Sequence, residues 1–285
     1  MKKERKREME TTVLSAYSDS NVAFTHLISE KPSDDSFRLH SHNVCEITYI
    51  VSGEVSWVIE GRSYMIRKND LVILRPNLVH GVHIHGVEIY ERYNVSFDDK
   101  SITDNALEDV PHEIEVLNFS SNTYVTDLFK KLAFYNKSFS GERKRILISH
   151  IIEELVFNLT LQTSGKSDES SMHINPVLAR ALKYMDENYT KCVGVEDMCR
   201  ELYISKSHIH ALFSEHLRIS PKKYLNLKRL AHAQKLIRGG KKPYAIYREC
   251  GFSDYASFYR NYKIHFGYAP SFELERNMQI YIDVE

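Results

Sequence analysis

Short apolar runs separated by turn residues dominate the chain from about residue 22 to residue 97. Four of them, EITYIV, VSWVIE, SYMI and LVIL, are rich in β-branched and aromatic residues, and SGE, EGR and RKND lie between them. Such runs predict short strands, and many strands at close, even spacing predict an antiparallel sandwich or barrel. We therefore expect an N-terminal antiparallel β-barrel domain over residues 10–120.

The hydrophobic period changes to that of a helix in ERKRILISHIIEELVFNLTLQ, residues Glu142–Gln162. Its apolar stripe is wide and strongly hydrophobic. The stripe either packs on the barrel or pairs with a second copy of itself. We favour the second alternative, and so expect a helical dimerisation segment over residues 121–162 and a homodimer.

A polar stretch, QTSGKSDESSMHINP, follows this helix. Its serine, glycine and charged residues are typical of a flexible linker, which we place at residues 163–176. Helical patterns continue after Pro176, and they predict an all-α domain over residues 177–285.

A repeat lies inside this helical domain. The segment Glu201–Pro221 (ELYISKSHIHALFSEHLRISP) aligns with Glu249–Pro270 (ECGFSDYASFYRNYKIHFGYAP), and the second copy has one extra residue after its serine. In each copy a short amphipathic helix precedes a tight turn, and Ser205 or Ser253 is the expected N-cap of a second helix. The sequence therefore predicts two helix-turn-helix units.

The second helix of each unit has an apolar face and a face of small or hydrogen-bonding residues. At about 100° per residue, Ile209, Leu212 and Phe213 share one side of the first helix, while Phe258 and Tyr262 do so in the second. The opposite faces suit a helix in a DNA major groove, where polar tips read base edges. The alternative is a helical bundle with solvated polar faces, which two matched units make less attractive.

Charge supports the same interpretation. The whole chain has 38 basic and 38 acidic residues, but residues 191–272 contain 15 Lys and Arg against 6 Asp and Glu, a net charge of +9. A basic segment in a neutral chain predicts a polyanionic partner, although an ordinary solvated helical surface would give a similar excess.

The helical region resembles the DNA-binding domain of the AraC/XylS family of bacterial transcription regulators. Matching residues include Ser205, Phe213, Pro221, Arg229, Gly251, Phe252, Arg260, Phe266 and Pro270. The resemblance implies two units that contact adjacent major grooves of double-stranded promoter DNA. It implies base-reading roles for Ser207, His208, His210, Ala211, Tyr255, Ala256, Ser257 and Arg260, and we expect phosphate contacts from Ser205, Arg218 and Lys263. Arg218 replaces the family's usual glycine, and the short side chain of Ala211 would read fewer bases.

The strand region carries a second resemblance, to the cupin barrel (double-stranded β-helix) and to the effector domain of the same regulators. HSHNVCEITYIVSG and NDLVILRPNLVH resemble its two-part signature. In metal-binding cupins such residues hold a divalent ion, which the resemblance places at His40, His42, Glu46 and His80. We favour a metal-free pocket for a small molecule, with purely structural histidines as the third alternative. The expected effector-binding residues are Arg38, His40, His42, Glu46, Trp57 and His80, although Trp57 is equally suited to filling the core.

These features together predict a transcriptional regulator, by preference an activator, which responds to a small molecule such as a sugar and works with RNA polymerase. We expect no cofactor. A cupin metalloenzyme is the second hypothesis, but the sequence shows no nucleophile motif and no phosphate-binding glycine loop. A nucleoid-type binder without an effector is a third. No apolar run is long enough to cross a membrane, no apolar stretch follows the charged start, and the few cysteines suit a reducing compartment, so we expect a cytoplasmic, nucleoid-associated protein.

Overall fold

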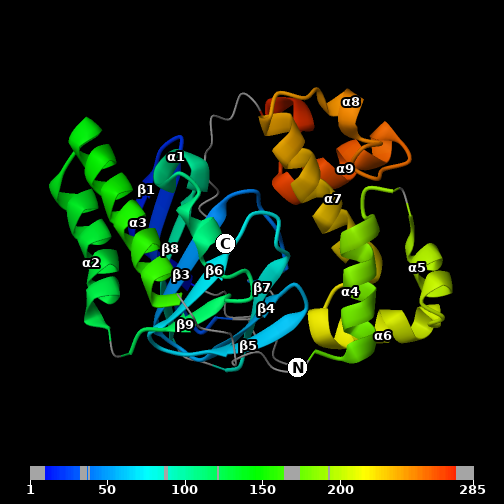
Figure 1. Ribbon diagram of the computed structural model, residues 1–285, viewed down its shortest axis with the longest axis horizontal. Coiled ribbons are helices and arrows are strands. Elements are labelled where there is room, and N and C mark those ends of the chain that lie inside the picture. The colour runs from blue at the N-terminus through cyan, green and yellow to red at the C-terminus, as the bar shows by residue number, and fades with distance from the viewer. Residues whose placement is uncertain are drawn as a thin grey trace, which may run out of the picture.

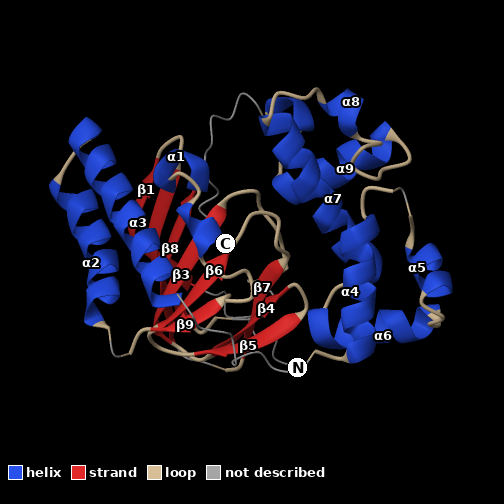
Figure 2. Ribbon diagram, in the orientation of Figure 1, coloured by secondary structure: helices blue, strands red, loops and turns tan. Residues whose placement is uncertain are grey.

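The computed structural model describes residues 10–32, 37, 39–86, 89–120, 122–163, 174–191 and 193–273. Figure 2 shows a strand-rich half and an all-helical half, in agreement with the fold class expected from the sequence. The basic start of the chain, most of the predicted linker and residues 274–285 lie outside the described residues.

The N-terminal half contains two antiparallel sheets. The larger has the strand order β1-β2-β8-β3-β6-β9 and the smaller has the order β5-β4-β7. Each run predicted as a strand is confirmed, and β1 precedes the region in which strands were expected. The strands are β1 (Glu10–Ser18), β2 (Val22–Glu30), β3 (Cys45–Ser52), β4 (Val55–Ile59), β5 (Arg62–Ile66), β6 (Asp70–Leu74), β7 (His80–Ile84), β8 (Ile89–Phe97) and β9 (Val116–Asn118).

Two hydrophobic cores lie on opposite sides of the larger sheet. One fills the space between the sheets, and Ile50, Ile59 and Leu74 belong to it. The other lies between the larger sheet and a layer of helices, where Ile47 and Val95 meet helical side chains. The central strands β3 and β6 are therefore buried on both faces and read as nearly continuous apolar runs.

The helical layer consists of a few short and two long helices, which cover the outer face of the larger sheet (Figure 1). They are α1 (Asp99–Thr103), η2 (Ala106–Asp109), α2 (Thr123–Ser138) and α3 (Gly141–Thr163). The apolar stripe of α3 packs against this sheet, with Ile148, Ile152 and Leu155 fully buried. Our preference for a stripe that pairs with a second copy was wrong for these residues, because the sheet already covers them.

The C-terminal half is all-helical, as expected. Its elements are α4 (Pro176–Asn188), α5 (Val195–Glu201), α6 (Lys206–Leu217), α7 (Pro221–Arg238), α8 (Pro243–Ile246), α9 (Tyr255–Phe266) and η3 (Pro270–Phe272). Helices α5 and α6 form the first helix-turn-helix unit, α8 and α9 form the second, and α7 joins them (Figure 1). Each unit has its own small core, one around Phe213 and one around Phe258.

The second helices of the two units, α6 and α9, are called the reading helices below, and they begin with different N-cap residues. In the first unit Ser205 caps α6 as predicted, since its hydroxyl accepts a hydrogen bond from the amide of His208 at 3.2 Å. In the second unit the N-cap is Asp254, whose carboxylate accepts from the amide of Ser257 at 2.7 Å. The prediction of Ser253 as the cap was wrong by one residue, because the extra residue in this copy moves the start of the helix forward.

The helical half packs against the smaller sheet. Val58 and Val79 from the sheet domain share a core with Leu178 and Leu182 of α4. At Gly61 an added Cβ would lie 2.0 Å from the Leu182 Cδ1 atom, so glycine permits this close approach. Among the described residues no helix is both long and apolar enough to span a bilayer.

Candidate DNA interface and effector pocket

The first reading helix presents its predicted DNA face to solvent. Ile209, Leu212 and Phe213 are buried in the domain core, as their spacing predicted. On the other side of α6 the side chains are exposed, and this set comprises Ser207, His208, His210 and Ala211. The structure therefore leaves this face open to a major groove.

The second reading helix shows the same division. Phe258, Tyr262 and Phe266 are buried, whereas Ala256 and Arg260 are exposed. The Arg260 guanidinium donates to the hydroxyl of the half-buried Ser257 at 3.4 Å.

Tyr255 is half-buried and lies within an aromatic cluster. Its ring centroid is 5.1 Å from that of Tyr244, 5.9 Å from that of Tyr247 and 5.8 Å from that of Phe258. This packing matches the helical angle that groups Tyr255 with the core.

The residues expected at DNA phosphates lie at helix ends or on exposed faces. Ser205 is at the start of α6, where its hydroxyl is engaged in capping. Arg218 is the C-cap of the same helix with φ of +54°, a left-handed conformation that explains the family's preference for glycine there. Lys263 is exposed in the last turn of α9.

A rigid connection holds the two units. Helix α7 has 18 residues, which correspond to a length of about 27 Å at 1.5 Å per residue. The Arg229 guanidinium donates to the carbonyl oxygens of Tyr189 at 2.8 Å and Val193 at 2.7 Å, which fastens α7 to the loop after α4.

A cavity of about 740 Å³ opens beside the predicted effector residues. This volume is typical of small-molecule sites, which span roughly 300–1,000 Å³. The residues lining it include His40, His42, Glu46, Trp57 and His80, so the structure brings together five of the six predicted effector residues. The sixth, Arg38, lies outside the described residues.

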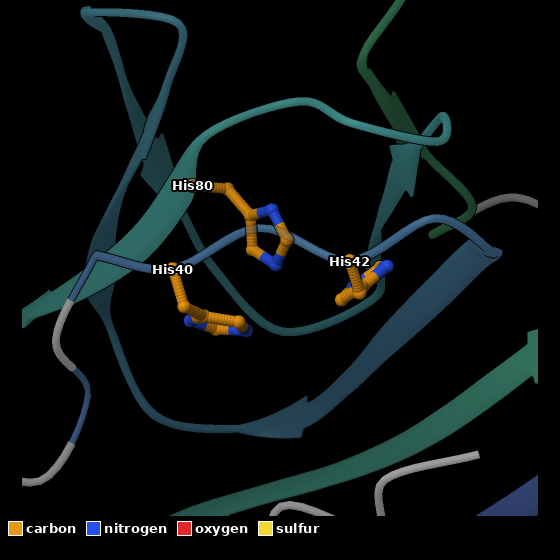
Figure 3. A group of neighbouring side chains, drawn as sticks. All are labelled: His40, His42 and His80. Carbon is orange, nitrogen blue, oxygen red and sulfur yellow. The ribbon is translucent and has the colours of Figure 1, made fainter. Parts of the chain in front are cut away.

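Three histidines converge on one wall of this cavity (Figure 3). His80 comes from β7, and His40 and His42 come from the segment before β3. Their potential ligand nitrogens all lie within 4.8 Å of one another. The His80 ring centroid is 4.3 Å from that of His40 and 4.8 Å from that of His42.

Backbone carbonyl groups orient two of these rings. The Nδ1 atom of His42 lies 3.0 Å from the carbonyl oxygen of Val44, and the Nδ1 atom of His80 lies 2.9 Å from that of Leu78. Because a carbonyl only accepts hydrogen bonds, each Nδ1 carries a proton. The Nε2 atom of His42 faces the Glu46 carboxylate. Such orienting bonds are typical of metal-ligating histidines, and the residues present fit a divalent transition-metal ion.

The pKa values of His80 and Glu46 are both shifted at this cluster. Burial lowers the pKa of His80 well below its ordinary value, and the neighbouring imidazoles of His40 and His42 add to this shift, so His80 is neutral. Burial alone would raise the pKa of Glu46. The hydrogen bond and charge of His42, with the other histidines, outweigh burial and lower the pKa to about 2. The Glu46 carboxylate oxygen lies 3.2 Å from His42 Nε2.

Trp57 and Arg92 form the aromatic and cationic parts of the wall. Trp57 stacks on His80 with 6.2 Å between ring centroids and donates to the Tyr90 hydroxyl at 3.3 Å. Arg92, which the sequence analysis missed, lies over the rings of Phe37 and Tyr90 at 5.1 and 4.7 Å. Arg92 lies in the β8 run IYERYNVSF, which also contains Glu91, Asn94 and Ser96, so no local pattern singled it out.

The other wall of the cavity comes from the helical domain. It is formed by residues of α7 and α9, among them Lys223, Asn226, Gln234, Asn261 and His265. The sequence analysis missed this wall, because contacts between distant domains leave no local pattern in the sequence.

Polar contacts fasten this wall to the sheet domain. Glu60 accepts from the Lys228 ammonium at 3.1 Å and from the Tyr224 hydroxyl at 2.9 Å, and Asn43 accepts from Arg238 at 2.6 Å. Burial by itself lowers the pKa of Lys228, but the nearby carboxylates outweigh burial and raise it, so the buried ammonium stays charged.

Comparison with known proteins agrees with both halves. A family model described as an AraC-like ligand binding domain matches residues 25–133, and a helix-turn-helix domain model matches residues 198–276. The lactose operon transcription activator of Staphylococcus xylosus is 24% identical over 224 residues, or 78% of this chain and 80% of that protein. The raffinose operon transcriptional regulatory protein RafR of Pediococcus pentosaceus is 26% identical over 149 residues, or 52% of each. The structure of ToxT from Vibrio cholerae O395 is 14% identical with a TM-score of 0.39, and the match covers 90% of this chain and 99% of that one.

A ligand-binding sheet domain joined to two helix-turn-helix units defines a DNA-binding transcriptional regulator rather than an enzyme. The chain belongs to the AraC/XylS family.

Proposed function

We propose that this regulator activates transcription in response to a sugar bound in the cavity between β7 and α7. The observation that carries the proposal is the cavity itself, which combines a ligand-sized volume with Trp57, the neutral His80 and His265, and amide groups. Aromatic faces and hydrogen-bonding tips suit a hydroxylated ring. Two relatives named for lactose and raffinose operons support the sugar class, and one of them is named an activator.

The single tryptophan makes the sugar proposal testable. Trp57 is the only tryptophan in the chain and lines the cavity, so its fluorescence reports on occupancy. We expect one member of a panel containing lactose, raffinose, galactose and glucose to change the emission saturably. The same sugar should raise the melting temperature, because a ligand that binds only the folded state stabilises it. In Trp57→Phe the fluorescence signal disappears, which tests its source. If no sugar in the panel changes either signal, the sugar assignment fails.

For the DNA contacts, we propose that α6 and α9 read adjacent major grooves. The predicted base-reading side chains on the exposed faces support this role, and phosphate contacts are proposed for Lys263 and Arg218, which are exposed. RNA polymerase is the proposed second macromolecular partner, and the cytoplasmic nucleoid is the proposed location.

A homodimer remains part of the proposal, through a different surface from the buried stripe of α3. Ile146, Phe157 and Leu161 of α3 are 40%, 44% and 75% exposed. At about 100° per residue these three side chains share one outward face of the helix. A second copy of α3 would cover this exposed stripe.

A divalent transition-metal ion is the second candidate occupant, because the carbonyl groups of Val44 and Leu78 orient His42 and His80. The metal-free cavity is the first proposal, since the space is far larger than an ion. If metal binds, protein incubated with zinc and then desalted should retain about one equivalent, and His80→Gln should weaken retention about 10–100-fold. Elemental analysis measures both. Retention below about 0.2 equivalents would exclude a site of the strength expected for zinc.

A further inference from the structure

The effector cavity is built from two domains. Strands β7 and β8 and the segment before β3 form one wall, and helices α7 and α9 form the other. Helix α9 is also the second reading helix, whose exposed face carries Ala256 and Arg260. One helix therefore faces DNA with its first turns and the cavity with Asn261 and His265.

Four residues that line this cavity each have a buried polar side-chain atom with no hydrogen-bond partner among the described residues. Two belong to the sheet domain, His80 Nε2 and Asn94 Oδ1, and two belong to the helical domain, Gln234 Oε1 and His265 Nε2. His80 and Gln234 are only 1% and 2% exposed. A buried polar group without a partner is costly, so an occupant of the cavity that supplies these hydrogen bonds would be stabilised.

The chemistry of these atoms defines the occupant. The Asn94 and Gln234 oxygens can only accept, and His80 Nε2 accepts because its Nδ1 carries the proton. A ligand that satisfies them needs donors that point toward both domains. Hydroxyl groups arranged around a ring meet this requirement, because each hydroxyl both donates and accepts.

We propose that the effector is a hydroxyl-rich ligand that bonds to both domains at once, with the helical domain as the lid of its cavity. This inference rests on the proposed function and deepens it. A ligand bonded to His265 and to His80 fixes the position of α9 relative to the sheet domain. Occupancy of the cavity is thereby coupled to the placement of a DNA-reading helix, and the coupling is reciprocal.

The first experiment measures affinity in the full-length chain. Variants Gln234→Met and His265→Ala remove lid contacts, and Glu249→Gln changes an exposed residue of the same domain. With the sugar that responds in the panel, Trp57 titrations should show about tenfold weaker binding for each lid variant and no change for Glu249→Gln. Unliganded melting temperatures check that the variants fold. Equal affinity in all four proteins would overturn the proposal and leave a sugar-binding barrel.

The second experiment needs no ligand. Trp57 is 4% exposed, and in our proposal the lid helps to shield it. The double variant Glu60→Gln/Asn43→Ala weakens the hydrogen bonds that hold α7 to the sheet domain. Acrylamide should therefore quench Trp57 more strongly in this variant than in the parent or in Glu249→Gln. Unchanged quenching in a folded variant would contradict the proposal that the helical domain covers the cavity. If quenching rises but no sugar binds, the lid stands and the sugar assignment of the proposed function fails.

Discussion

Arg260 shows how a single side chain would carry sequence specificity. It is exposed on α9, and its guanidinium lies 3.4 Å from the Ser257 hydroxyl, which holds it over the reading face. Arginine can donate two hydrogen bonds to the O6 and N7 atoms of guanine.

We expect Arg260→Ala to weaken binding to a specific promoter duplex by about 1–3 kcal/mol and to relax the preference for one base pair. Fluorescence anisotropy at fixed salt, with a specific and a scrambled duplex, measures the difference. Arg143→Ala, an exposed arginine of α3, is the matched control. An equal loss on both duplexes would show that Arg260 contacts phosphate instead.

His265 makes stability depend on pH. Burial lowers its pKa to about 4, and His40, Lys223 and His42 add to the shift, while a hydrogen bond to the Ser41 backbone opposes it. The unfolded chain takes up a proton near the ordinary pKa of about 6.5, but the folded chain does not. Stability from this group is therefore complete above pH 6.5 and falls as pH drops toward 4, by at most about 1.4 kcal/mol per pH unit.

The variant His265→Gln should remove this contribution. Melting temperatures between pH 7.5 and 4.5, in a buffer with a metal chelator, should fall less steeply in the variant than in the parent. His80 titrates in the same direction and keeps some slope in both proteins. Parallel curves would mean that His265 is solvated in solution.

At the scale of elements, the turn before α9 depends on Gly251. Its φ is +83°, and an added Cβ would lie 2.0 Å from the Tyr189 carbonyl oxygen and 2.6 Å from Arg229 Nε. That Cβ would separate the hydrogen bond between Arg229 and Tyr189, which fastens α7 in place.

Gly251→Ala should therefore destabilise the protein by more than about 2 kcal/mol, from the strained backbone and the clash together. Gly240→Ala isolates the first contribution, since Gly240 has φ of +89° and no heavy atom within 4 Å of an added Cβ. We expect it to cost only about 1 kcal/mol. Thermal unfolding compares the two variants, and similar losses would remove the role assigned to the clash.

Features that depend on residues close together in the sequence were predicted correctly more often than contacts between residues far apart in it. Short strands, helix caps and reading faces depend on neighbours within a few residues, so Ser205 and the exposed face of α6 were predicted correctly. The stripe on α3 was recognised, but a spacing pattern does not say which surface covers it. Here the sheet covers Ile152 and leaves Leu161 exposed. The lid could not be predicted, because contacts such as Asn43 with Arg238 join residues 195 positions apart.

At the scale of the whole molecule, the two domains meet through a mixture of apolar packing and buried polar contacts. Val58 and Val79 pack on α4, while Glu60 holds Lys228 and Tyr224. The predicted DNA faces of α6 and α9 stay exposed when the domains are docked. The same arrangement leaves the outer face of α3 on the far side of the sheet from the helical domain (Figure 1).

The outer face of α3 is the surface through which we expect two copies of the chain to form a dimer. Phe157 and Leu161 are exposed on α3, and pairing with a second copy would bury them. Sedimentation should show a dimer for the parent and a monomer for Phe157→Glu/Leu161→Glu, because paired copies would bring four carboxylates into an apolar contact. Lys137→Glu, on an exposed site of α2, controls for the added charge. The variant should bind a single half-site as the parent does but lose the extra affinity for two half-sites, since two linked modules bind with a higher effective concentration. A parent that sediments as a monomer, or a variant that remains a dimer, would place the assembly surface elsewhere.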